Sequence, residues 1–229
     1  MIRLIDVSKS FDGYEALKHV SLTIADGETL AIIGGSGSGK STLLRLLIGL
    51  IKPTSGEIYI GEQEIGHMTE QELKPIRLHM GMVFQYSALF DSMTVGDNVA
   101  FGLREHTDLS EARIADIVRE KLHLVGLDGV EDLMPGELSG GMKKRVSLAR
   151  AIAIEPSIIF YDEPSSGLDP IMTEKIDELI IHTQRALHVT SVVVTHDMAS
   201  ACRIADRIAM IYEADEGGFY LAARAGFNP

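Results

Sequence analysis

The sequence predicts an α/β fold with a parallel sheet, and three observations carry that prediction. Short apolar runs recur along the 229 residues, and most are too uniformly apolar to leave one face in water, which is typical of parallel strands buried on both sides. Amphipathic helical patterns lie between these runs, and such alternation favours an α/β sheet. From about residue 94 to residue 153 the helical patterns follow one another without a strand. We therefore expect an α/β core with an inserted α-helical subdomain.

The expected strands are the apolar runs themselves. They are Leu4–Val7, Leu30–Ile33, Met82–Phe84, Ile158–Tyr161, Val192–Val194 and Ile208–Ile211. Three segments near the start, Ile2–Val7, Val20–Ile24 and Glu57–Ile60, are separated by turn residues. We expect these three to form an antiparallel β edge.

The expected helices are marked by apolar residues that share one face. One face carries Ile176, Leu179, Ile180, Thr183 and Leu187, and another carries Ile114, Ile117, Val118, Leu122 and Val125. Ser110 and Ser139 stand where helix N-caps are expected. The helical subdomain should therefore contain several separate helices.

These elements predict one domain over residues 1–229. Residues 1–93 and 154–212 would form the α/β core with its β edge, and residues 94–153 the helical subdomain. The tail, residues 213–229, has no clear role, and a loosely ordered terminus is the favoured interpretation.

Charge and cysteine content narrow the class of protein. Lys plus Arg total 21 against 33 Asp plus Glu, a net charge of −12, which argues against a general nucleic-acid binder. The single Cys202 cannot form an internal disulfide, and this fits a reducing cytosol. The apolar stretch Leu43–Ile51 is far shorter than the roughly 20 residues that span a bilayer. We expect a cytoplasmic protein whose membrane role, if it has one, comes through a partner.

A glycine-rich loop follows the expected strand Leu30–Ile33 directly. Its sequence, Gly-Gly-Ser-Gly-Ser-Gly-Lys-Ser, satisfies the P-loop pattern, and a helix is expected to begin near Lys40. Glycines let backbone N–H groups wrap phosphate oxygens, the lysine holds the β and γ phosphates, and the final serine is placed to bind Mg²⁺. The predicted nucleotide-binding residues are Gly34, Gly35, Ser36, Gly37, Ser38, Gly39, Lys40, Ser41 and Thr42. The fold prediction becomes a P-loop NTPase core of the RecA-like kind that binds ATP and Mg²⁺.

Two adjacent carboxylates end the expected strand Ile158–Tyr161. Because side chains alternate along a strand, Asp162 and Glu163 should point in different directions and have different roles. Asp162 suits Mg²⁺ binding through water, and Glu163 suits a general base for the attacking water. Alone, such a pair is more often a helix cap or a solvated turn. Beside a P-loop, the catalytic interpretation is favoured.

A second anion site is predicted at the segment Leu138–Met142, which reads Leu-Ser-Gly-Gly-Met. It precedes a helical run, so Ser139 and the amides of Gly140 and Gly141 would lie at a helix N-terminus. The sequence thus predicts two anion sites in a chain that has only one P-loop.

Taken in order, these motifs resemble those of the ATP-binding cassette (ABC) ATPases. The resemblance rests on Leu138–Met142 with Gln85, Asp162-Glu163-Pro164, Ser166-Gly167-Leu168-Asp169 and His196-Asp197, and covers about residues 1–212. It implies a head-to-tail homodimer, in which the second anion site of one subunit closes over the γ-phosphate held by the P-loop of the other.

The resemblance also implies roles for further residues. Gln85 would contact Mg²⁺ or the attacking water and report to a transmembrane partner, Asp169 would signal across the dimer, and His196 would steady the γ-phosphate. Phe11 would stack on adenine, with Tyr14 as the less favoured substitute. Taken singly, these residues also fit a strand-end amide, a helix cap, a structural histidine and a core ring.

Two departures from the family pattern stand beside the resemblance. Met142 occupies a position where many members have Gln, which removes a polar side chain but leaves the backbone donors. The family often continues past its last core strand with a glycine-containing hairpin and a further helix, and Glu213–Pro229 matches this poorly.

Segments Phe84–Val95, Asn98–Phe101 and Leu138–Val146 are similar to one branch of the family. That branch serves phospholipid trafficking with substrate proteins of the mammalian-cell-entry type, and is known from organic-solvent tolerance and maintenance of lipid asymmetry. It implies an ATPase on the inner face of the cell membrane that powers a separate permease, with a lipid-binding substrate protein and no nucleic acid. A groove near Gln85–Asp91 would accept a short helix of the permease.

Other functions remain open at this point. The chain could serve an importer of another small solute, or be a soluble ABC ATPase acting on DNA or ribosomes, although those usually carry two cassettes or a long coiled-coil insertion. A regulatory protein that binds ATP without hydrolysing it would not need Glu163 and His196. A GTPase would need a guanine-reading motif such as Asn-Lys-x-Asp, and none is visible.

Overall fold

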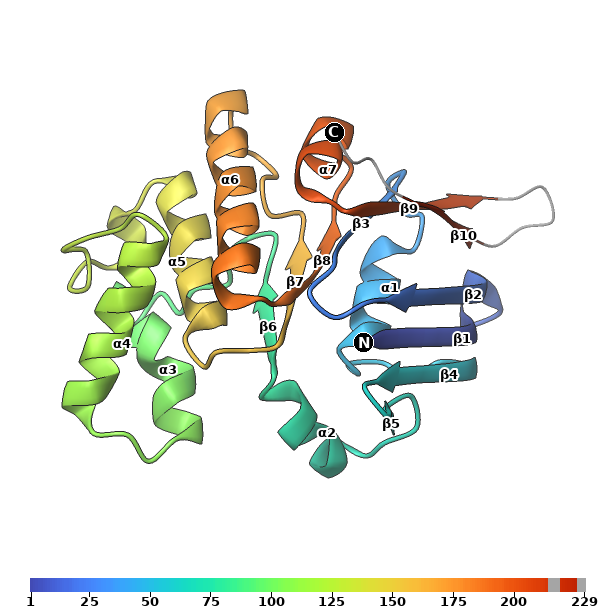
Figure 1. The fold of residues 1–229 in the computed structure, drawn as a ribbon, viewed down its shortest axis with the longest axis horizontal. Helices are drawn as coiled ribbons and strands as arrows, with labels where there is room; N and C mark the ends of the chain where they lie inside the picture. Colours follow the sequence, from blue (N-terminus) through green and yellow to red (C-terminus); the bar gives the residue numbers. More distant parts are fainter. Residues whose placement is uncertain (214–218, 226–229) are drawn as a thin grey trace.

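The strands form two sheets in the residues that the computed structural model describes, which are 1–213 and 219–225 (Figure 1). One sheet is antiparallel, in the order β2-β1-β4-β5, and the other is mainly parallel, in the order β10-β9-β3-β8-β7-β6. This arrangement confirms the predicted α/β fold with an antiparallel edge.

The antiparallel sheet is built from the N-terminal segments. Its strands are β1 (Ile2–Phe11), β2 (Tyr14–Ile24), β4 (Ser55–Ile60) and the short β5 (Gln63–Glu64). Asp12 and Gly13 both have positive φ and turn β1 into β2, so that Phe11 pairs with Tyr14. Leu4–Val7, which also fits the pattern of a buried parallel strand, belongs to this sheet.

The mainly parallel sheet contains the other expected apolar runs. Its strands are β3 (Thr29–Gly34), β6 (Met80–Val83), β7 (Ile158–Asp162), β8 (Thr190–Val194), β9 (Arg207–Glu213) and β10 (Phe219–Ala225). Every neighbouring pair from β9 to β6 is parallel, and β10 runs antiparallel to β9. Phe84, expected at the end of a strand, lies just past β6 and is exposed.

The tail prediction was wrong for residues 219–225. They form β10, whose backbone pairs in continuous register with β9 from Phe219–Glu213 to Ala225–Arg207, and which lies beside β2. The hydrogen-bonding partner of this strand is the edge of β9, and a local sequence pattern does not encode that pairing. Glu213, the first residue of the predicted tail, ends β9, and residues 214–218 and 226–229 lie outside the described residues.

The parallel sheet has a hydrophobic core on each face, because successive side chains on a strand point to opposite sides. Ile158 and Phe160 of β7 pack with the antiparallel sheet and with α1 (Lys40–Leu47), which lies between the two sheets (Figure 1). Ile159 and Tyr161 pack with the helices on the other face. This two-sided burial explains why the strands are continuously apolar.

The remaining helices fall between the strands as the periodicity indicates. They are α2 (Glu70–Arg77), α3 (Val95–His106), α4 (Glu111–Leu124), the 3₁₀ turn η1 (Pro135–Glu137), α5 (Gly140–Ile152), α6 (Pro170–Leu187) and α7 (Met198–Ile204). Ser110 and Ser139 are the predicted N-caps, and their hydroxyls accept hydrogen bonds from the backbone N–H groups of Arg113 and Met142. Within residues 94–153, all of which are described, α3 to α5 follow one another without a strand.

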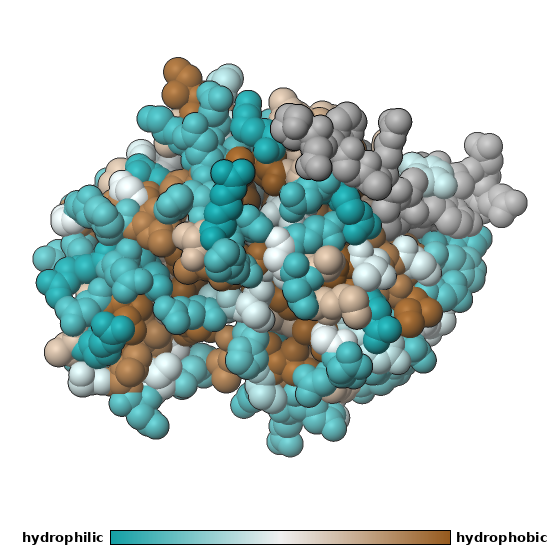
Figure 2. All heavy atoms as spheres, viewed as in Figure 1, coloured by the Kyte–Doolittle hydropathy of each residue, from teal (hydrophilic) through white to brown (hydrophobic). Residues whose placement is uncertain are grey.

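The surface in the same view is mixed. Figure 2 shows patches of hydrophobic side chains among hydrophilic ones, several of them over the helical group at the left. Over the described ranges 1–213 and 219–225, no helix is both long and apolar enough to cross a bilayer.

The carboxyl ends of the parallel strands meet at one edge of the sheet. The P-loop follows β3, Gln85 follows β6, Glu163 follows β7 and His196 follows β8. In open α/β sheets, ligands bind at this edge. The topology thereby gathers residues that are up to about 160 positions apart in the chain.

Candidate active site

The P-loop is a tight backbone cradle closed by a lysine. Gly39 has a φ of 89° and is the N-cap of α1, and Lys40 is the helix's first residue. Lys40 is buried, and its Nζ donates to the carbonyl oxygens of Gly34 and Gly35, both at 2.9 Å. A Cβ at Gly34 would lie 2.5 Å from Oγ of Ser38, so this position requires glycine.

A cavity of about 730 Å³ lies in front of the loop. Its lining combines Gly34, Gly35, Ser36, Gly37, Lys40 and Ser41 with Gln85, Glu163 and His196, and Ile33, Met198 and Met210 complete it. The fold thus brings the P-loop and the three predicted catalytic residues to one space. Their chemical roles stay predictions.

A second cavity, of about 240 Å³, adjoins the loop on the side of the antiparallel sheet. It is lined by Phe11, Tyr14 and Ala16 together with Gly37, Ser38, Gly39, Lys40, Ser41 and Thr42. Phe11 is 43% exposed and so is not a core ring, and Nζ of Lys9 lies 4.8 Å from the centre of its ring. An exposed aromatic face beside the phosphate cradle suits stacking on a base.

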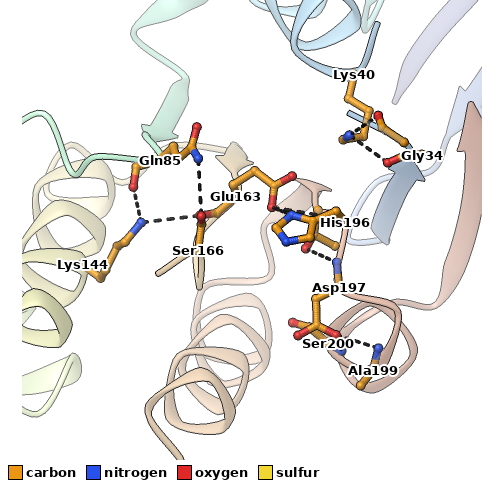
Figure 3. Close-up of polar contacts among 12 residues, drawn as sticks. Gly34, Lys40, Gln85, Lys144, Glu163, Ser166, His196, Asp197, Ala199 and Ser200 are labelled. Carbon is orange, nitrogen blue, oxygen red and sulfur yellow. Dashed lines mark hydrogen bonds and ion pairs between the residues drawn. The ribbon is translucent and has the colours of Figure 1, made fainter. Parts of the chain in front are cut away.

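Glu163 does not continue the alternation of strand β7, which ends at Asp162. Its φ is 48°, a left-handed conformation that costs a non-glycine residue energy and is often found at active sites. Its backbone N–H donates to the carbonyl of Val194 at 2.9 Å, and its Oε2 lies 2.7 Å from Nδ1 of His196 (Figure 3). The two carboxylates do have different surroundings, but the left-handed turn, not strand alternation, separates them.

Asp162 is half-buried at the end of β7, where it pairs with Val194 of β8. Burial raises the pKa of its carboxyl, and the charge of Glu163 raises it further, whereas Arg45, Lys40 and Lys144 lower it. Asp162 thus lies beside one other carboxylate and three cationic side chains and is not among the residues that line the cavity, and its role as a Mg²⁺ ligand stays a prediction.

His196 is held by the first turn of α7. The side chain of His196 is 66% exposed. The carboxylate of the next residue, Asp197, accepts hydrogen bonds from the backbone N–H groups of Ala199 at 2.8 Å and Ser200 at 3.2 Å. This cap fixes where the helix begins and therefore where the imidazole lies.

Gln85 lies half-buried in a contact network that the sequence did not predict. Its Nε2 donates to Oγ of Ser166 at 3.4 Å, and its main-chain oxygen accepts a hydrogen bond from Nζ of Lys144 (Figure 3). A sequence signal existed, because Lys144 falls in the apolar period of α5 between Gly141 and Leu148, all three of them buried.

Asn98 is the other residue that sequence reasoning missed. It is fully buried, its Oδ1 accepts from the N–H of Phe90 at 2.8 Å, and its Nδ2 donates to the carbonyls of Phe90, Met93 and Thr94. It thereby fixes the segment that follows Gln85, and its only sequence signal was a polar residue inside the first turn of a helix.

The predicted second anion site is not brought to the P-loop of the same chain. Ser139 and Gly140 are exposed at the start of α5, outside both cavities, and a Cβ at Gly141 would lie 2.4 Å from Cε of Met172 of α6. Asp169 is likewise the N-cap of α6, accepting from two backbone N–H groups at 3.0 Å. Within one chain these residues cap helices, as the alternative interpretation of Asp169 has it.

The residues present fit ATP with Mg²⁺. The glycine cradle leaves no room for a Cβ at Gly34, the buried ammonium of Lys40 faces the cavity, and Phe11 offers an aromatic face. The described residues contain no cluster of three or more His, Cys, Asp or Glu side chains that could hold a metal.

The fold and this site define a P-loop nucleoside triphosphatase. Residues 17–166 match the family model described as ABC transporter. The chain belongs to the ABC transporter family, which confirms the resemblance of its motifs.

Individual proteins of known sequence or structure are also similar to this chain. The chain is 48% identical to the intermembrane phospholipid transport system ATP-binding protein MlaF of Haemophilus influenzae, over 82% of this chain and 71% of that protein. It is 45% identical to the probable ribonucleotide transport ATP-binding protein mkl of Mycobacterium bovis, over 92% of this chain, and spans 59% of that relative's length. The dimeric post-hydrolysis structure of the ATP-binding cassette MJ0796 bound to ADP and Pi superposes with a TM-score of 0.88 at 34% identity, covering 99% of this chain and all of the other.

Proposed function

We propose that this chain is the ATP-hydrolysing subunit of an ABC transporter. The observation that carries the proposal is the shared cavity in which the P-loop faces Glu163 and His196. Lys40 and the loop amides bind the triphosphate, and Mg²⁺ bound with ATP neutralises phosphate charge. Glu163 accepts a proton as the oxygen of water bonds to the γ-phosphorus and the bond to the bridging oxygen breaks, which yields ADP and phosphate.

The active form is a head-to-tail homodimer. Ser139 and Gly140 begin a 13-residue helix, are exposed, and lie outside the cavities of their own chain. A helix N-terminus favours an anion, so the γ-phosphate held by a second copy is its natural ligand. Support also comes from the similar cassette MJ0796, whose solved structure is dimeric. Asp169 then lies in the loop next to this contact and transmits closure between subunits.

The permease contacts the segment after Gln85. Tyr86 is 87% exposed, and Phe84, Phe90 and Phe101 also expose large parts of their rings. Arg150 and Asn98 fix the backbone of this segment through hydrogen bonds. An apolar surface on a fixed backbone suits docking of a short apolar helix.

The cargo is a phospholipid or another apolar, lipid-like molecule. This rests on the motif segments quoted above and on the 48% identity to the Haemophilus influenzae phospholipid transport protein. Through the permease the chain would sit on the inner face of the cell membrane, with a lipid-binding substrate protein in the same system. Of the sequence alternatives, an importer of another small solute remains the competing outcome.

The Glu163→Gln variant tests the catalytic and dimer proposals together. Turnover should fall by about 10²–10⁴-fold while ATP binding is retained, and light scattering with ATP and Mg²⁺ should show a dimer. Ser139→Arg in the same background blocks the second anion site, and should bind ATP yet stay monomeric. Glu163→Gln protein that stays monomeric with saturating ATP, even beside its permease, would contradict the dimer.

Copurification tests the cargo. The chain should be isolated with its membrane subunit, and mass spectrometry should find phospholipid in the complex. A sugar, an amino acid or a nucleotide carried in its place would contradict the lipid proposal and favour the importer of a small solute.

A further inference from the structure

A buried lysine of α5 contacts the main chain of two loops at the active site. Lys144 is 7% exposed, and its Nζ donates to the carbonyl oxygen of Gln85 and, at 3.5 Å, to that of Glu163. In Figure 3 its side chain extends from the helix toward both loops. These oxygens belong to the two residues that follow β6 and β7, which are neighbouring strands of the sheet.

The two loops also contact each other around Ser166. The carbonyl of Glu163 accepts a hydrogen bond from the N–H of Ser166 at 3.1 Å, and Oγ of Ser166 accepts one from Nε2 of Gln85 at 3.4 Å. Lys144 therefore completes a closed set of contacts that joins α5, the Gln85 loop and the turn of residues 163–166. Moving any one member moves the backbone of the others.

Stability alone does not explain a lysine at this position. Burial lowers the pKa of Lys144, against the opposing effect of the Glu163 and Asp162 carboxylates. Taking an ammonium out of water is costly, and an apolar side chain of similar length often replaces a buried charge with equal or better stability. Methionine would fill the same space but leave the carbonyl oxygen of Gln85 without this donor, so what distinguishes the lysine is its hydrogen bonding to these two main-chain oxygens.

The first two turns of α5 connect this ammonium with the proposed dimer contact. The helix begins at Ser139–Gly141, the proposed contact to the nucleotide of the partner copy, and Lys144 follows within its first two turns. A helix is stiff over this length, so a displacement of its N-terminus also displaces the Lys144 ammonium. The ammonium in turn holds the main chain of Gln85 and Glu163 in the chain's own site.

We propose that Lys144 is a positioning residue. It links the contact between α5 and the nucleotide of the partner copy to the alignment of Glu163 and Gln85 at the chain's own nucleotide site. The inference rests on the proposed head-to-tail dimer. It assigns Lys144 no contact with ATP.

Two substitutions at Lys144 test the link. Lys144→Met removes the donors but keeps the length, and should lower kcat by about 10- to 100-fold, as misplacement of reacting groups does, with the KM for ATP within about twofold of wild type. The Hill coefficient for ATP should approach 1. Lys144→Arg restores donors and should recover most of the turnover. Were the methionine variant not to fold, Lys144→Gln, with a shorter donor, should show the same pattern.

Lys121→Met is the matched control. Lys121 is 2% exposed in the same helical layer, and its Nζ contacts Glu120 at 2.9 Å and Glu155 at 3.1 Å, away from the cavity. This variant loses a buried ammonium and should change thermal stability while keeping kcat and cooperativity.

Three results would overturn the inference: wild-type kcat in Lys144→Met, an unchanged Hill coefficient, or an equal loss of kcat in Lys121→Met. Failure of the dimer proposal would appear elsewhere, as Glu163→Gln protein that stays monomeric with ATP while its Lys144 is intact.

Discussion

Nδ1 of His196 lies 2.7 Å from Oε2 of Glu163, and this contact joins the ends of two neighbouring parallel strands. The carboxylate is 13% exposed in its side chain and the imidazole 66%, and both residues line the cavity. The same carboxylate oxygen also lies 3.4 Å from the backbone N–H of His196. The proposed base is therefore oriented by a neighbour that follows another strand.

This contact predicts the effect of His196→Ala. Without the imidazole the Glu163 carboxylate loses its 2.7 Å partner and keeps only the longer backbone contact, so kcat should fall by about 10- to 100-fold through misorientation. His196→Gln keeps a hydrogen-bond donor and should lose less. Steady-state ATPase assays measure both, with ATP binding to the purified chain as the check that the P-loop is intact. Wild-type turnover in His196→Ala would remove the histidine from this role.

The cradle predicts opposite outcomes at two adjacent glycines. A Cβ at Gly34 would lie 2.5 Å from Oγ of Ser38 and 2.7 Å from the carbonyl oxygen of Ile211, whereas a Cβ at Gly35 meets nothing within 4 Å. Overpacking costs about 1–3 kcal/mol, which corresponds to a loss of about 5- to 150-fold in ATP affinity when the loop shifts to relieve it. Titration with a fluorescent ATP analogue should show this loss in Gly34→Ala and a clearly smaller one in Gly35→Ala. Equal affinities would contradict the steric argument.

The hydrogen bonds of Arg150 predict that a substitution there weakens the coupling to the permease but not ATP hydrolysis itself. Its two Nη atoms donate to the carbonyls of Ala88 at 2.7 Å and Ser87 at 2.9 Å, and both residues have positive φ. Arg150→Lys replaces the planar two-armed donor with one ammonium on a shorter side chain, and should lower the free energy of unfolding by about 1–2 kcal/mol. Basal ATPase activity should stay within about twofold of wild type, while stimulation by the permease falls. Amide hydrogen exchange at residues 86–90 should become faster. Arg185→Lys, on the surface of α6, is the control and should change neither the stimulation by the permease nor this exchange rate.

Asp177 predicts a pH-dependent stability. It is fully buried in α6, accepts a hydrogen bond from Ser200, and pairs with Arg203 of α7 at 2.5 Å. Burial raises the pKa of its carboxyl above the ordinary 3.8, although Ser200 and Arg203 oppose the rise. The folded chain therefore holds a proton that the unfolded chain has released, so the free energy of unfolding falls as pH rises from about 3.8 through the raised pKa.

Urea denaturation of wild type and Asp177→Asn at several pH values measures this effect. The stability of the wild type minus that of the variant should decrease as pH rises through the window, because asparagine does not titrate. The raised pKa of Asp162 affects both proteins equally and cancels in the difference. Parallel stability curves would contradict the prediction.

Much of the fold could be read from local patterns. The parallel strands, the P-loop and the caps at Ser110 and Ser139 depend on side-chain periodicity and on short spacings, which a single segment carries. The strand β10 could not be predicted in this way, because its pairing partner lies on another element.

The site could be predicted only in part. The order of the glycines, the lysine and the acidic pair predicts phosphate chemistry. The left-handed turn at Glu163 cannot be predicted from a strand pattern. Lys144 and Asn98 were missed because a polar residue within an amphipathic helix is ordinarily a solvated one. Their burial depends on which loops pack against the helix.

The sequence alone determined the class of nucleotide site, since eight consecutive residues of the P-loop specify both the backbone shape and the charge that a triphosphate requires. Only the tertiary structure decided which distant residues share that site. Gln85, Glu163 and His196 meet there because parallel strands bring their carboxyl ends to one edge of a sheet. Pairing between strands is a long-range contact, and no short stretch of the chain encodes it.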